Sequence, residues 1–146
     1  MRTYSQESLA DEFERHADQE GHILAEYRVL ADDLGDSAAG VLVNQILTDE
    51  EIHHLLLRTM AGWLRAQSLG ADTMKVPHNA NRTELLRRTR MLQEHERETI
   101  EACRELQPRL SGDMAGLLGT LLEVLILDSE KHEKMLRAVE RILTSA

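Results

Sequence analysis

Apolar residues recur along the chain at alternating steps of three and four residues, which is the spacing of one face of an α-helix. This pattern predicts four long helices, at about 5–34, 37–68, 82–107 and 114–143. The chain contains only two prolines, one Trp, two Tyr and one Phe. Because strands favour aromatic and β-branched residues, this composition also favours helices, and the expected fold class is all-α.

Residues typical of turns separate these segments into two pairs. Gly35 supplies a stop for the first helix, and Asp36 or Ser37 can cap the second. In the second pair, Pro108 disfavours continuation of the third helix, and Gly112 lies in the turn before the fourth. The sequence therefore predicts two helical hairpins that form a four-helix bundle.

A linker at 69–81 joins the two predicted hairpins. Asn81 is expected to cap the third helix, and Asp113 is expected to cap the fourth. About 13 extended residues span roughly 40 Å, so the linker allows a crossover along the length of a bundle but does not demand one. With 146 residues, the chain is expected to form a single domain over 1–146.

The apolar face of each predicted helix is interrupted by polar residues near its centre. Within a bundle, these faces would point to the interior, where polar side chains need partners. The interrupting residues are Glu20 in the first helix, Glu50 and His53 in the second, Glu96 in the third, and Ser129 and His132 in the fourth.

The distances along the chain place these polar residues in one layer of a bundle. Glu20 and Glu50 each lie 15 residues from Gly35. Each residue alone has an ordinary explanation, because an inward Glu can reach water and a core His is commonly hydrogen-bonded. Burying three carboxylates and two imidazoles without partners would cost several kcal/mol for each group. No Lys or Arg lies on the same faces to neutralise the carboxylates. A bound cation would offset that cost.

These residues resemble those of the ferritin-like di-metal carboxylate proteins, including rubrerythrin-type domains without a rubredoxin domain. In that superfamily, two helices each present one inward Glu and the other two each present Glu-x-x-His. The resemblance covers nearly the whole chain and implies a ferritin-like bundle that holds iron, with manganese or zinc as alternatives. The metal ligands that it implies are Glu20, Glu50, His53, Glu96 and His132.

The sequence departs from the superfamily pattern at Ser129, where the family has a glutamate that usually bridges two metals. Asp128, one turn before His132, is a candidate replacement, and so is water. His16, one turn before Glu20, is a further candidate ligand or a hydrogen-bond partner of one. We therefore expect two iron ions per chain. The alternative is a site that has lost ligands or that binds a single ion.

The resemblance implies an oxidoreductase of the ferroxidase or peroxidase type, which oxidises Fe²⁺ or reacts with dioxygen or peroxide. One alternative is a redox-inert zinc site at Glu20, Glu50 and His53. Another is a non-catalytic helical module that serves assembly or partner binding. Val124, Ile126 and Leu127 extend the apolar surface of the fourth helix and predict a homo-oligomer through that helix.

Charge and composition exclude several other classes of protein. A net charge of −9 argues against nucleic-acid binding, which requires a concentrated basic surface. Cys103 is the only cysteine, so no disulfide within the chain and no Cys-x-x-Cys metal site is expected. The sequence has no secretory signal and no apolar run of about 18 residues, so we expect a cytoplasmic protein that does not enter the membrane.

Overall fold

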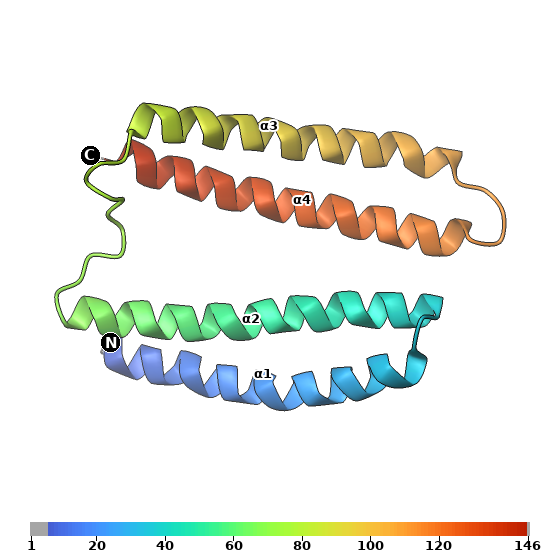
Figure 1. Cartoon of the computed structure of the whole chain (residues 1–146), viewed down its shortest axis with the longest axis horizontal. Coiled ribbons are helices and arrows are strands. Elements are labelled where there is room, and N and C mark those ends of the chain that lie inside the picture. The colour runs from blue at the N-terminus through green and yellow to red at the C-terminus, as the bar shows by residue number, and fades with distance from the viewer. Residues whose placement is uncertain (1–5, 146) are drawn as a thin grey trace, which may run out of the picture. The chain divides into compact units, whose positions relative to one another are not determined.

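The computed structural model describes residues 6–145, which form four long α-helices (Figure 1). No strand occurs in this range, so the predicted all-α class is confirmed. Residue 5, the expected start of the first helix, lies outside the described residues. The elements are α1 (Gln6–Leu34), α2 (Ala38–Ser68), α3 (Arg82–Leu106), a short 3-10 helix η1 (Gln107–Arg109) and α4 (Ala115–Thr144).

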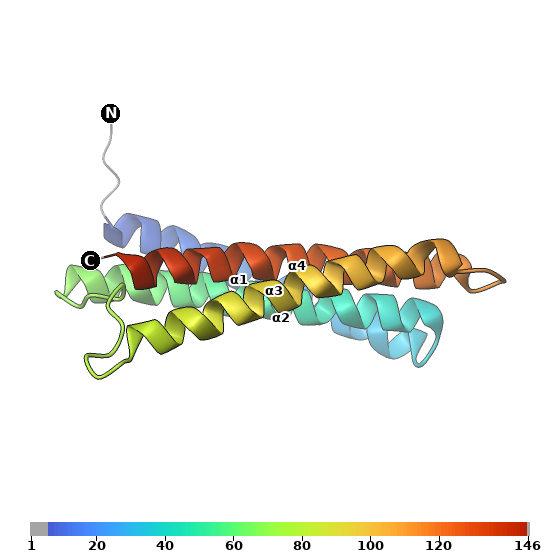
Figure 2. The ribbon, with the colours of Figure 1, turned by 90° about the horizontal axis from the view of Figure 1, so that it is seen from above.

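The chain divides into two compact units between Thr73 and Met74, and each unit is a helical hairpin. In the first hairpin α1 packs against α2, and in the second α3 packs against α4. Figures 1 and 2 show the two helices of each hairpin lying side by side. The two predicted hairpins are thus confirmed, whereas the single-domain, ferritin-like bundle stays a prediction.

Small residues form the seam between α1 and α2. Ala10, Ala17, Leu24 and Ala31 recur every seven residues on α1, and all four are buried. A seven-residue repeat is typical of helices that pack along their length, and alanine lets two backbones approach closely. The seam therefore fixes the register in which polar residues of α1 meet those of α2.

The apolar face predicted for the first helix lies beside this seam and is partly exposed in the hairpin. Ile23 is 49% exposed and Leu30 is 46% exposed. A pair of helices can bury only the residues between them, so larger apolar side chains on the flanking face need another partner. The first hairpin consequently presents an open apolar surface on both sides of its central polar residues.

The helices begin and end close to the residues that the sequence predicts. Gly35 adopts a φ of +57°, which favours glycine, and ends α1. Asn81 Oδ1 accepts a hydrogen bond from the Glu84 amide at 3.2 Å, as the expected cap of α3. The cap predicted at Asp113 is wrong, because α4 begins after Met114 without a side-chain hydrogen bond.

Ser37 caps α2, and its removal tests how much the turn contributes to the first hairpin. The Ser37 hydroxyl accepts a hydrogen bond from the Gly40 amide at 3.1 Å. Replacing Ser37 with alanine leaves that amide without its partner, so we expect a loss of about 1 kcal/mol in the free energy of unfolding. Urea denaturation followed by circular dichroism measures the difference. An unchanged midpoint would contradict a stabilising role for this hydrogen bond.

The second hairpin has its own small core. Ile100 and Cys103 of α3 pack with Ile126 of α4, and Leu122 lies against them. Cys103 is buried, as expected for a structural thiol. Within residues 6–145, no helix combines the length and apolar character required to cross a membrane.

Candidate metal centre

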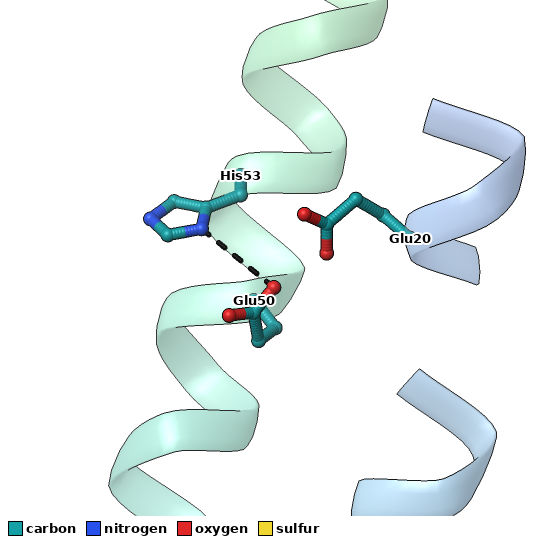
Figure 3. Close-up of side chains that lie close together, drawn as sticks. All are labelled: Glu20, Glu50 and His53. Carbon is teal, nitrogen blue, oxygen red and sulfur yellow. Dashed lines mark ion pairs between the residues drawn. The ribbon is translucent and has the colours of Figure 1, made fainter. Parts of the chain in front are cut away.

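Three of the predicted ligands converge in the first hairpin, with Glu20 on α1 and Glu50 and His53 on α2 (Figure 3). One ligand atom from each residue lies within 4.8 Å of the others. Glu50 and His53 share a face because they are three residues apart, and Glu50 Oε2 lies 3.7 Å from His53 Nδ1. Glu20 meets them because both glutamates are equally far from the turn at Gly35.

The two carboxylates of this group are close enough to affect each other's protonation. A hydrogen bond with Glu50 is the main cause that raises the pKa of Glu20, followed by burial and by repulsion from the Glu50 charge. The carboxylates thus favour sharing one positive charge between them. A metal cation is a ligand that supplies positive charge at this position.

Glu20 and Glu50 line a hollow of about 580 Å³ on the first hairpin, and His53 lies outside its lining. The Glu50 side chain is 22% exposed and His53 is 54% exposed, so the ligands are partly open to solvent. His16 lines this hollow but does not belong to the three-residue group. The lining residues are Phe13, His16, Gln19, Glu20, Ile23, Tyr27, Glu50 and Leu57.

The second hairpin brings together the two remaining predicted ligands. Glu96 Oε1 of α3 lies 3.4 Å from His132 Nδ1 of α4. Ser129 is 6% exposed and buried within the hairpin. Asp128, the suggested replacement for a bridging glutamate, pairs with Lys131 at 3.3 Å. This pair therefore has one carboxylate and one imidazole, whereas the first hairpin has two carboxylates and one imidazole.

His54 is adjacent to the candidate ligand His53 but has a different role. Its Nδ1 donates to the Ala17 carbonyl at 2.8 Å, and its Nε2 accepts from Arg58 Nε at 3.1 Å. The Nδ1 hydrogen bond therefore joins α2 to α1, whereas the Nε2 hydrogen bond lies within α2. His54 accordingly does not belong to the group of Glu20, Glu50 and His53.

Gln19 lines the hollow, and the apolar periodicity gave no reason to select it. It precedes Glu20 and is turned about 100° from it around α1, outside the predicted apolar face. The seven-residue repeat of the α1–α2 seam, by contrast, is visible in the sequence as Ala10, Ala17, Leu24 and Ala31. That repeat would have identified the face of α1 that contacts α2.

The chain was compared with protein-family models, curated proteins and solved structures, and none of them matches it.

Proposed function

We propose that this chain is a ferritin-like metal-binding protein that holds iron at Glu20, Glu50 and His53. The proposal rests on one observation, the convergence of two carboxylates and an imidazole from α1 and α2 within 4.8 Å of one another. Glu96 and His132, which the resemblance to di-metal carboxylate proteins also implies as ligands, form a separate pair in the second hairpin. Iron is the proposed metal, and manganese and zinc use the same donors.

The residues around the group suit a redox-active ion. Phe13, Ile23 and Leu57 place apolar surface beside the carboxylates. Bound Fe²⁺ would supply an electron to dioxygen or peroxide, which makes the proposed activity that of a ferroxidase or peroxidase. Glu20 and Glu50 would balance the positive charge of the ion, and His53 would add a neutral donor.

Iron loading of a matched pair of variants tests this proposal. We expect the untagged wild-type chain, loaded anaerobically with Fe²⁺, to retain iron after desalting and to change absorbance when dioxygen or peroxide is added. Glu50→Ala should retain at least about tenfold less iron, because it loses one of three donors. Glu51→Ala is the matched control, since Glu51 is the next residue on α2 and pairs with Arg28.

Each alternative function predicts a different result in this experiment. Retained iron that does not react with either oxidant would leave metal binding but exclude the proposed oxidation. Preference for zinc over iron in a competition experiment would favour a redox-inert site. A folded wild-type chain that retains none of these metals would contradict the proposal and favour a helical module for assembly.

A further inference from the structure

We infer that a second copy of this chain completes the metal site, by placing its own α1–α2 hairpin against the first. This inference rests on the proposed function and specifies where the remaining ligands come from. The two hairpins would meet through the faces that carry Glu20, Glu50 and His53, and the two copies would share two metal ions.

The numbers of ligands favour two copies of the first hairpin. A di-metal carboxylate site in a helical bundle uses one Glu from each of two helices and Glu-x-x-His from each of two others. One α1–α2 hairpin supplies half of this set, because it contains Glu20 and the pair Glu50 and His53. Two copies of this hairpin supply all six residues. The second hairpin supplies only Glu96 and His132, because the buried Ser129 stands where the motif has its glutamate.

The position of the ligands along the helices suits a symmetric dimer. Glu20 is the middle residue of α1, which spans Gln6–Leu34, and His53 is the middle residue of α2, which spans Ala38–Ser68. In a twofold dimer, a residue near the symmetry axis lies next to the same residue of the partner. An axis through the middle of the hairpin therefore brings both sets of ligands together and lets the helices overlap over their full length.

The surface around the ligands has the character and size of a dimer interface. Apolar residues lie on the ligand-bearing faces along the hairpin, and five of them are exposed within it. A hairpin of this length offers a face about 45 Å long and about 20 Å wide, or about 900 Å², and a specific interface buries about 800 Å² per partner. The exposed residues are Leu9, Ile23 and Leu30 on α1, and Ile46 and Met60 on α2.

The charge of the same face predicts that the dimer requires metal. Two copies would bring four carboxylates together, and no Lys or Arg lines the hollow that contains them. Their repulsion in a region of lowered dielectric opposes association, and divalent ions remove it. Metal binding and association of the two copies are therefore one coupled equilibrium.

Native mass spectrometry of the full chain with Mn²⁺ tests the coupling without any redox reaction. We expect metal-free monomers at low micromolar concentration and, with Mn²⁺, dimers that carry two ions. Glu20→Gln should remain monomeric and bind at least about tenfold less Mn²⁺. A monomer that binds one or two ions would overturn the shared site while leaving the proposed metal binding intact. A folded chain that binds no ion would overturn both.

Two pairs of variants separate a shared site from a site within one chain. Met60→Glu puts a charge on the proposed interface, two turns from His53, and should abolish the dimer and weaken Mn²⁺ binding. Leu55→Glu puts the same charge on an exposed position on the other side of α2 and should leave both unchanged. The double variant Glu96→Gln and His132→Gln should still form the two-ion dimer. Loss of Mn²⁺ from that double variant would overturn the inference.

Discussion

Replacing Ala17 with leucine is expected both to destabilise the first hairpin and to weaken its proposed metal site. Ala17 is 0% exposed in the seam between α1 and α2, one turn before Glu20. The larger side chain has no space there, so it should push the helices apart at a cost of about 1–3 kcal/mol. The same displacement separates Glu20 from Glu50 and His53. Urea denaturation and Mn²⁺ titration calorimetry measure the two effects.

Ala25→Leu is the control for this substitution. It makes the same change from alanine to leucine at an exposed position of α1, so the change in helix propensity is the same. We expect its unfolding free energy to stay within about 0.5 kcal/mol of the wild type and its Mn²⁺ affinity to be unchanged. If Ala17→Leu retained both wild-type stability and wild-type affinity, the close approach of the helices at Ala17 would not be what positions the ligands.

The helices and their ends follow from local chemistry, which is why the sequence predicts them well. Gly35 stops α1 because glycine adopts a positive φ at low cost, and Ser37 and Asn81 cap the helices that follow them. Asp113 has the right chemistry for a cap, but α4 starts one residue later, after Met114. A capping residue in the sequence permits a helix start without fixing its position.

The grouping of Glu20, Glu50 and His53 was also predictable, because it depends only on helix period and distance from one turn. Glu50 and His53 share a face through their spacing, and Glu20 reaches them because antiparallel helices pair residues equally far from the turn. The same reasoning cannot tell which face of α2 contacts a partner, because Leu55 and Trp63 are also apolar and exposed. Hydrophobic period shows that a surface needs a partner, but it does not identify that partner.

The seam between the helices shows a second limit of hydrophobic patterns. Large apolar residues dominate such patterns, whereas the α1–α2 contact is made mainly of alanines. Alanine buries little area, so its contribution comes from letting the backbones approach. As a result, residues such as Ile23 and Leu30, which were expected in the core of a bundle, are exposed in the hairpin itself.

Glu50→Gln is expected to stabilise the metal-free protein and to abolish its stabilisation by metal. In the wild type, Glu50 raises the pKa of Glu20 by hydrogen bonding and charge, so the two carboxylates oppose each other when both are ionised. A glutamine amide removes one charge and can donate to Glu20. We expect the melting temperature of the metal-free variant to exceed that of the wild type by a few degrees, equivalent to about 1 kcal/mol or less.

Addition of metal should reverse this order. At a free Mn²⁺ concentration of about 100 times Kd, binding stabilises the wild type by about 2.7 kcal/mol, while the variant gains far less because it lacks a charged donor. Differential scanning calorimetry with and without Mn²⁺ measures both comparisons. Glu51→Gln is the matched control and should keep the wild-type response to metal, since Glu51 pairs with Arg28 away from the site. A variant that is less stable than the wild type without metal would show that the two carboxylates stabilise the fold, instead of being held together for a cation.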